Sequence, residues 1–144
     1  MIRKATVEDA RVAAELACKL WPGHSVGDIT AELCEVLCDT DCAIFLSYAG
    51  VSAVGFAQCG LRHDYVEGTE TSPVGYLEGI YIEEAFRKKG YARELLTACQ
   101  QWDKAKGCKE FASDCELSNT QSLRFHLHCG FEEANRIICF TKKL

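Results

Sequence analysis

The segment from Tyr76 to Trp102 constrains the fold of this chain most strongly, because it runs from a strand through a basic glycine turn into a helix. Residues 76–82 are rich in β-branched and aromatic side chains, a composition that predicts a strand. The helix that follows has apolar residues at the i, i+3, i+4, i+7 spacing of one buried face, at Ala92, Leu95, Leu96 and Cys99.

The turn between this strand and this helix has the features of an anion site. The N–H groups in the first turn of a helix lack partners and carry a partial positive charge. Gly90 removes the side chain that would block close approach of a ligand, and Arg87, Lys88 and Lys89 add positive charge. The turn therefore predicts an anion site, most naturally for phosphate. The Rossmann and P-loop fingerprints are both absent.

Length and charge restrict the classes of partner. The 144 residues predict a single domain spanning residues 1–144, and 48% hydrophobic with 26% charged residues is typical of a soluble globular protein. The net charge of −5 argues against a nucleic-acid partner and suits a polycationic one. No stretch approaches the length of a membrane span, so no membrane partner is expected.

The ten cysteines predict neither a disulfide scaffold nor a metal site. No signal-peptide pattern is visible at the N-terminus, so we expect a cytoplasmic, reduced protein. No C-x-x-C pair is present, and Cys34, Cys38 and Cys42 lack the paired spacing of a zinc site. We predict that most of the cysteines are small buried hydrophobes.

The remaining pattern predicts the element order β-αα-βββ-α-β-α-ββ. Caps and breakers mark several boundaries: Thr6 with Asp9 before the first helix, Gly107 after the central helix, and Ser118 with Gln121 before the last helix. The expected strands are 2–5, 42–48, 51–61, 76–82, 109–114, 131–133 and 136–141, and an exposed loop is expected at 62–73.

The spacing Arg87-x-x-Gly90-x-Ala92 resembles the pyrophosphate-binding motif of the GCN5-related N-acetyltransferases. This resemblance implies an α+β fold with α/β/α layers and a mixed, mainly antiparallel central sheet that splays between strands 4 and 5. Gly79 in the middle of the fourth strand is compatible with the bulge that this splay requires. The same resemblance implies acetyl-CoA as the co-substrate. The cofactor-binding residues that it implies are the backbone of Ile80, Tyr81 and Ile82, the turn residues Arg87, Lys88, Lys89, Gly90, Tyr91 and Ala92, and Asn119 at the start of the last helix.

Longer stretches resemble one branch of that family, the aminoglycoside 6′-N-acetyltransferases. They imply acetylation of the 6′-amino group of aminoglycoside antibiotics, which confers antibiotic resistance, and they imply a homodimer. The stretches are Leu20-Trp21-Pro22-Gly23-His24, Arg62-His63-Asp64-Tyr65-Val66, Leu77-Glu78-Gly79-Ile80, Ala112-Ser113-Asp114 and Gly130-Phe131-Glu132-Glu133.

The resemblance also implies a substrate site of carboxylates and aromatic walls. Glu78 and Asp114 match substrate-binding acids, and Trp21 and Tyr65 match aromatic walls of the sugar pocket. Glu78 is also the predicted catalytic base, because an amine with a pKa of about 10 must lose a proton before it attacks. His24, beside Trp21, is a further candidate for a hydrogen bond to the substrate.

Two positions depart from the family pattern. His126 stands where many acetyltransferases carry a tyrosine that protonates the departing thiolate, so His126 is a possible general acid. Asn135 stands where some of the resembled enzymes carry an acid, and it is included among the substrate-binding residues.

The residues leave two alternative functions open. An acidic pocket suits any cation, so the acceptor could be a polyamine or a protein amine on the same fold. The replacement of the usual tyrosine by His126 would also fit a non-catalytic module that binds acyl-CoA. The sequence does not indicate which aminoglycosides are preferred.

Overall fold

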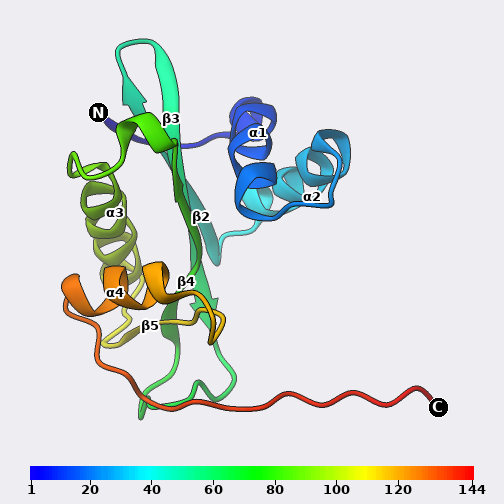
Figure 1. Ribbon diagram of the computed structural model, residues 1–144, viewed down its shortest axis with the longest axis vertical. Helices are drawn as coiled ribbons and strands as arrows, with labels where there is room; N and C mark the ends of the chain where they lie inside the picture. Colours follow the sequence, from blue (N-terminus) through cyan, green and yellow to red (C-terminus); the bar gives the residue numbers. More distant parts are fainter.

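The computed structural model describes residues 1–144 and has three layers, with a central sheet between two layers of helices (Figure 1). The strands are β1 (Ile2–Lys4), β2 (Cys42–Ala49), β3 (Ser52–Arg62), β4 (Val74–Ile82) and β5 (Phe111–Ser113). The helices are α1 (Ala10–Leu20), α2 (Val26–Cys38), α3 (Tyr91–Ala105) and α4 (Thr120–His128), with short 3₁₀ turns at Val7–Asp9 and Glu84–Phe86.

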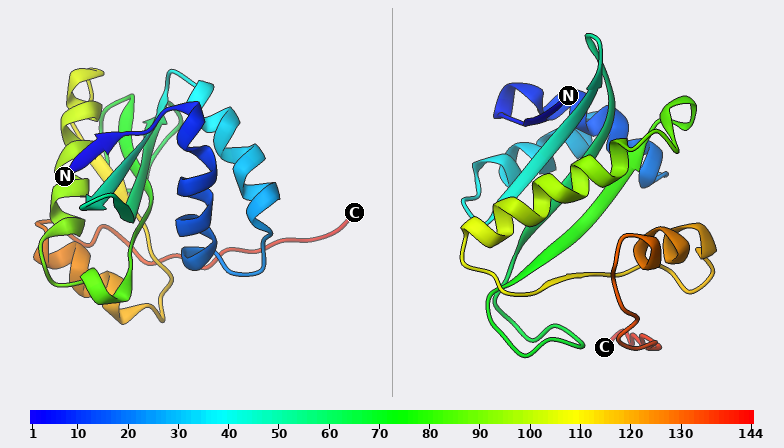
Figure 2. Two further views of the ribbon diagram at one scale, coloured as in Figure 1. Left: turned by 90° about the horizontal axis from the view of Figure 1, so that it is seen from above. Right: turned by 90° about the vertical axis from the view of Figure 1, so that its left-hand side faces the viewer.

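The five strands lie side by side in the order β1-β2-β3-β4-β5. The pairs from β1 to β4 are antiparallel, and only β4 with β5 is parallel. Helices α1 and α2 cover one face of the sheet, and α3 and α4 lie on the other (Figure 2). The predicted fold class and its mixed, mainly antiparallel sheet are therefore confirmed.

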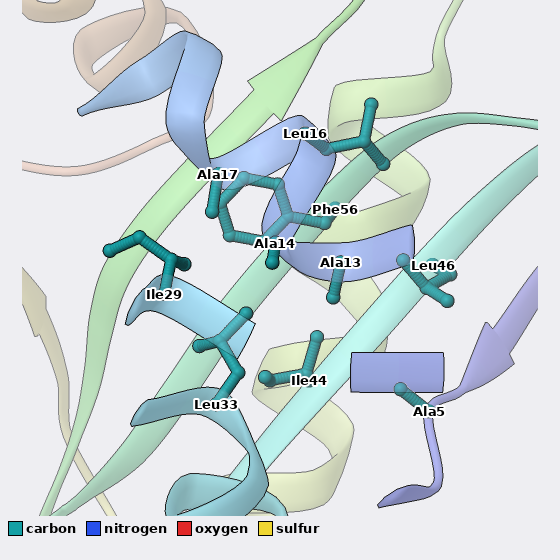
Figure 3. Packing of buried hydrophobic residues seen from close by; sticks show 10 residues of the cluster. All are labelled: Ala5, Ala13, Ala14, Leu16, Ala17, Ile29, Leu33, Ile44, Leu46 and Phe56. Atoms are coloured by element: carbon teal, nitrogen blue, oxygen red, sulfur yellow. The ribbon is translucent and has the colours of Figure 1, made fainter. Parts of the chain in front are cut away.

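Two apolar clusters hold the layers together. The first joins α1 and α2 to β2 and β3, with Phe56 packed against Ala14 and Ala17 of α1 (Figure 3). The small alanine side chains let α1 approach the strands closely, so that the larger Phe56, Ile44 and Leu46 fill the space between the layers. The second cluster joins α3 to the opposite face of the sheet, through Leu95, Leu96 and Cys99 of α3 and Ala43, Phe45, Ala57, Cys59, Leu77 and Ile82 of the strands.

The caps match the predictions at one end of the chain and differ at the other. Before α1, the Asp9 carboxylate accepts a 2.7 Å hydrogen bond from the Thr6 backbone N–H, as the predicted capping box requires. Before α4, the cap is Asn119, whose side-chain oxygen accepts a 3.0 Å hydrogen bond from the Ser122 N–H. The predicted pair of Ser118 and Gln121 is therefore wrong by one residue, because an amide at position 119 can bond the same orphan donors.

The two last predicted strands, at 131–133 and 136–141, are not formed. After α4, residues 131–144 contain neither helix nor strand, and they run away from the body of the protein beneath the sheet (Figure 1). A strand requires a neighbouring strand for its hydrogen bonds, and this segment has none within its own chain. Its apolar side chains are exposed instead, at Ile137, Ile138 and Phe140.

The prediction that most of the cysteines are buried is wrong. Cys59, Cys99 and Cys108 are buried, and the remaining thiols are exposed or half-buried. The sequence pattern failed here because amphipathic faces and loops can carry a small thiol at partly exposed positions. No helix combines the length and the apolar surface that crossing a lipid bilayer requires.

Candidate active site

The separation of β4 from β5 creates the central feature of the site. These two strands pair only from Gly75 with Phe111 to Leu77 with Ser113, and β5 then ends. Strand β4 continues for several residues, paired with β3 along one edge and with nothing along the other. The backbone N–H and C=O groups on that free edge need partners, so this part of β4 is suited to binding an extended ligand. The predicted splay between strands 4 and 5 is confirmed.

A cavity of about 660 Å³ lies beside this free edge. It is bounded by β4, the start of α3 and helix α4, and it is large enough for part of an elongated cofactor. Most of the predicted cofactor-binding residues line it, and only Lys89 and Tyr91 of that set do not. The lining residues that match are Ile80, Tyr81, Ile82, Arg87, Lys88, Gly90, Ala92 and Asn119.

The start of α3 shows why glycine stands at position 90. Gly90 has φ +93° and forms the N-terminal cap of α3, a left-handed conformation that side-chain-bearing residues rarely adopt. A Cβ atom there would meet no neighbour within 4 Å, so the constraint is the backbone angle and not space. The N-terminus of α3, with its unpaired N–H groups, thus lies at the cavity wall, where an anion is favoured.

The basic side chains of the turn divide into two groups. Arg87 donates through Nε to the Ile82 carbonyl at 2.9 Å, and Lys89 donates to the Ala85 carbonyl at 2.9 Å. These two side chains therefore brace the turn against the end of β4 and the preceding 3₁₀ turn. Lys88 also lines the cavity, and Arg93 from the first turn of α3 does so as well. A phosphate at the helix start would meet fixed backbone donors surrounded by cations.

A bulge in β4 places Glu78. Leu77 pairs with Cys59 and Gly79 pairs with Gln58, so Glu78 is an extra residue with no cross-strand partner. Leu77 and Ile80, three residues apart, consequently both pack into the apolar cluster on the α3 side. Strict alternation would have put them on opposite faces. Gly79, directly after Glu78, is the mid-strand glycine that is compatible with a bulge in the sequence, and the register shift places the bulge beside it.

Gly79 also lets an aromatic side chain lie directly on the strand. A Cβ atom on Gly79 would come within 2.6 Å of the Trp21 ring, which stands at the end of α1. Trp21 in turn packs edge-on against Phe56, with ring centroids 6.0 Å apart. The predicted aromatic wall Trp21 is thus placed immediately beside the bulge that carries Glu78.

The two predicted acids belong to one connected group with two residues that the sequence analysis did not select. The Glu78 carboxylate accepts hydrogen bonds from Arg62 Nε at 3.1 Å and from Arg62 Nη2 at 3.0 and 2.9 Å. The Arg62 guanidinium lies over the Tyr76 ring, 3.4 Å from its centroid. The Tyr76 hydroxyl donates to Asp114. We call these four residues, Arg62, Tyr76, Glu78 and Asp114, the acid cluster.

The charges of the acid cluster follow from these contacts. The hydrogen bond to Glu78 raises the pKa of Arg62, so Arg62 is a permanent cation. Burial, and then the hydrogen bond to Asp114, raises the pKa of Tyr76, so its phenol stays neutral. The group therefore combines two carboxylates, one guanidinium and one neutral hydroxyl from the neighbouring strands β3 and β4 and the residue after β5, and Arg62 and Glu78 remain partly open to solvent.

No hydrogen bond joins the other predicted substrate residues to the acid cluster. His24 is exposed in the loop between α1 and α2, and Tyr65 is 77% exposed in the loop after β3. Asn135 donates to Glu67 of that same loop at 3.2 Å, so the chain after α4 touches the segment that carries Tyr65. Nothing in these contacts tests a role in binding, and the three residues remain predictions.

His126 is held by both ring nitrogens. Nδ1 lies 2.7 Å from the Ser122 carbonyl, which assigns the proton to that nitrogen, and Nε2 lies 2.8 Å from the Ser113 hydroxyl. The ring also packs edge-on against Phe131 at 5.0 Å. It does not line the cavity, and its contacts tie α4 to the end of β5. Its role as a general acid stays a prediction.

Sequence reasoning missed Arg62 and Tyr76 as members of the site. Arg62 lies in a stretch used for the resemblance, but an arginine in an acidic site for cations contradicts simple charge matching. Its position in the strand gave no signal either, because the register sets Arg62 opposite Val74, and Glu78 is the unpaired residue of the bulge. Tyr76 likewise gave no signal, because an aromatic residue in a strand usually belongs to the core.

Comparison with known proteins agrees with this geometry. Residues 10–131 match the acetyltransferase (GNAT) family. The chain belongs to this family. It is 44% identical over 144 residues to an aminoglycoside N(6′)-acetyltransferase type 1 of Stenotrophomonas maltophilia, a match that covers 99% of this chain and 93% of that protein. A second enzyme with the same name, from Serratia marcescens, is 42% identical over 137 residues, covering 94% and 92% of the two chains.

Solved structures of such enzymes share the fold. AAC(6′)-Iy in complex with a bisubstrate analogue, CoA-S-monomethyl-acetylneamine, superposes with a TM-score of 0.95 at 40% identity, covering 100% of this chain and 98% of that one. AAC(6′)-Iy in complex with CoA gives a TM-score of 0.96 at 40% identity, covering 100% and 95%. The family predicted from the glycine turn and the longer stretches is therefore confirmed.

Proposed function

We propose that this protein transfers the acetyl group of acetyl-CoA to the 6′-amino group of aminoglycosides, and thereby confers resistance to these antibiotics. One observation carries the proposal. The same short part of β4 has a free backbone edge beside a cavity and a bulge that carries Glu78 of the acid cluster. An acyl donor and a cationic acceptor can thus meet across one strand. The relatives named above support the choice of reaction and acceptor.

The residues that would hold the donor fit its chemistry. The helix start at Gly90 with Lys88 and Arg93 suits a pyrophosphate, and the free edge at Ile80 and Ile82 suits an extended amide-containing arm. When bound, acetyl-CoA supplies the thioester carbonyl as the electrophile. Backbone N–H groups of the free edge are the donors available to polarise that carbonyl.

The acid cluster supplies the acceptor chemistry. Glu78 accepts a proton from the acceptor ammonium, directly or through one water, and the freed amine nitrogen forms the bond to the acetyl carbon. The carbon–sulfur bond breaks, and the thiolate leaves and takes up a proton from solvent. Asp114, with the aromatic walls Trp21 and Tyr65, is suited to the other ammonium groups and the sugar faces of the substrate.

The direct test measures acetyl transfer with matched acceptors. Release of CoA thiol is followed with tobramycin and with a counterpart that carries a 6′-hydroxyl in place of the 6′-amine, and NMR locates the acetyl group on the product. We expect turnover only with the 6′-amine. Equal rates with both compounds would refute the regiospecific claim. Spermidine and a lysine peptide in the same panel test the polyamine and protein-amine alternatives, and turnover itself excludes the non-catalytic module.

We also propose that the protein acts as a homodimer in which residues 131–144 of each copy contact the other. The segment carries exposed apolar side chains at Ile137 (70%), Ile138 (80%) and Phe140 (87%) on an extended backbone without strand partners. The sheet has a free outer edge at β5. A second copy could satisfy both the apolar side chains and the unpaired backbone, since exchange of a terminal strand is an economical route to a dimer.

Light scattering after size exclusion tests the homodimer with a matched pair of variants. Ile138→Asp combined with Phe140→Asp should give a monomer, because each charge would be buried in the contact. Val51→Asp is the control, since Val51 is a 97% exposed apolar residue in the turn between β2 and β3. It should leave the mass of the complex unchanged. A monomeric unmodified protein would refute the proposal.

The ten free thiols fit a reducing compartment, and we propose that the reaction takes place in the cytoplasm.

A further inference from the structure

Arg62 is an unexpected residue in a site for a polycation. Its guanidinium lies within hydrogen-bond distance of Glu78, the predicted base, and over the ring of Tyr76, which donates to Asp114. A fixed positive charge at this place repels the ammonium groups of an acceptor. If the site served only to collect cations, this arginine would weaken it, so its presence requires another explanation.

The hydrogen bonds leave one oxygen of Glu78 available. Oε1 accepts from both Nε and Nη2 of Arg62, at 3.1 and 3.0 Å, and Oε2 accepts only from Nη2, at 2.9 Å. Each carboxylate oxygen can accept about two hydrogen bonds, so Oε2 retains a free acceptor position. Arg62 therefore fixes the orientation of the carboxylate and leaves Oε2 to receive a proton.

The guanidinium itself is held in place. It stacks at 3.4 Å on the Tyr76 ring, and Tyr76 is 6% exposed and anchored by its hydrogen bond to Asp114. A planar guanidinium that stacks on an aromatic face and forks onto a carboxylate has little freedom to swing away. Its charge thus stays beside Glu78 when a substrate arrives.

The electrostatic consequence concerns the acceptor amine. An isolated carboxylate favours the charged form of a neighbouring ammonium and so opposes the loss of the proton that attack requires. A cation paired with that carboxylate offsets the effect. We propose that Arg62 is a positioning residue that orients Glu78 and offsets its charge, so that the acceptor amine is bound without being locked in its protonated form. This inference rests on the function proposed above.

The other charged and titratable groups around Arg62 do not replace it. Burial raises the pKa of Cys42, at the start of β2, to about 11, so this thiol stays neutral, as does the Tyr76 phenol. His63 lies 2.9 Å from Asp41, so the partner of the His63 ring is Asp41 and not Glu78. Asp114 is the remaining nearby charge, and it is negative. Arg62 is therefore the cation that balances Glu78 within this group.

The test compares the Arg62→Gln and Arg62→Lys variants with the wild-type protein. It measures kcat and KM for tobramycin from pH 6 to 9. For Arg62→Gln we expect the acidic limb of the kcat profile to move to higher pH by about one unit, which gives about a tenfold loss near pH 7 and recovery at alkaline pH. KM should not rise, because a repulsive charge has been removed. Arg62→Lys keeps the charge and should restore most of the wild-type profile.

Arg3→Gln is the matched control. Arg3 also forks onto a carboxylate, Asp9, at 2.9 and 2.7 Å, and its guanidinium lies 5.4 Å from the Tyr48 ring, but it is remote from the cavity and the acid cluster. Loss of this ion pair should affect thermal stability without moving the pH profile. An unshifted profile in Arg62→Gln, or a loss of equal size at every pH, would assign Arg62 a merely structural role and overturn the inference.

A second readout separates this inference from the proposed function. Calorimetric titration of the protein with tobramycin, in two buffers of different ionisation heat, counts the protons released on binding. Wild type should release more protons than Arg62→Gln at pH 7, and equal release refutes the role of Arg62 even if wild type is an active enzyme. Absence of acetyl transfer by wild type refutes the proposed function, whatever the proton count.

Discussion

The two sides of β4 are built in different ways. The cofactor side depends on backbone: a strand edge without a neighbour, a helix start and the left-handed Gly90. The substrate side depends on side chains, the acid cluster of Arg62, Tyr76, Glu78 and Asp114. A backbone site recognises a ligand common to a whole family with little dependence on side-chain identity. A side-chain site can change its acceptor through single substitutions, because specificity depends on a few polar contacts.

The largest expected effect is on the substrate side. Glu78→Gln keeps the size of the side chain and removes the charge and the basicity. We expect kcat to fall by about 10²–10⁴-fold, the usual contribution of a general base, with CoA affinity unchanged. Steady-state kinetics and calorimetric titration with CoA measure the two quantities. A variant that lost CoA affinity as well would contradict the separation of the two sides, and full activity would remove Glu78 from the mechanism.

An intermediate effect is expected on the cofactor side, with a pair of glycines as the comparison. Gly90 and Gly107 have φ +93° and +94°, stand at opposite ends of α3, and have open space around the missing side chain. Alanine at either position costs roughly 1–2 kcal/mol of backbone strain. Only Gly90→Ala should also weaken CoA binding, by about tenfold, because it displaces the helix start that lines the cavity. Equal CoA affinity in both variants would show that this turn does not bind the cofactor.

The smallest effect concerns a carboxyl on the cofactor side that has no partner. Asp103 of α3 is 2% exposed, and neither of its carboxylate oxygens has a hydrogen-bond partner. It packs against β4 at Gly75, where a Cβ atom would come within 2.6 Å of the carboxyl carbon. Burial raises the pKa of Asp103 from 3.8 to about 7. Below about pH 4 both folded and unfolded chains are protonated, so the carboxyl then has no pH-dependent cost.

Between about pH 4 and pH 7 the Asp103 carboxyl ionises in the unfolded chain and stays protonated in the folded one. The free energy of unfolding therefore falls as pH rises, and it levels off above pH 7. Asp103→Asn removes this dependence. We expect the difference in melting temperature between Asp103→Asn and wild type to grow by several degrees in favour of the variant from pH 4 to pH 8. The value of kcat should be unchanged at any pH. Differential scanning calorimetry across this range measures the melting temperatures. A parallel pair of stability curves would show that Asp103 is not protonated in the folded protein.

Much of the site could be located from sequence because local pattern carries it. The run from residue 76 to 102 encodes a strand, a glycine that permits φ > 0 and an amphipathic helix, and each depends on residues adjacent in the chain. The structure brings Glu78 and Asp114 into one connected group, and their roles in binding and catalysis stay predictions. Their link through Arg62 and Tyr76 could not be predicted, because it joins the end of β3, the interior of β4 and the residue after β5, which only strand register brings together.

The end of the chain shows the opposite case. Residues 131–141 have the composition of strands, and the prediction of two strands there is wrong. Whether such a segment becomes a strand depends on a partner for its hydrogen bonds, which the sequence of the segment does not specify. In this structure α4 directs it away from the free edge of β5, and the partner is absent from its own chain.

The sequence by itself determined the family, the basic glycine turn and the succession of helices and strands as far as α4, because these follow from periodicity and from residues that are close along the chain. Only the tertiary structure decided that Glu78 is the extra residue of the bulge in β4, that Arg62 pairs with this carboxylate, and that the last segment lies outside the sheet. Those features depend on register and on contacts between distant residues, where shifts of one position change which side chains meet.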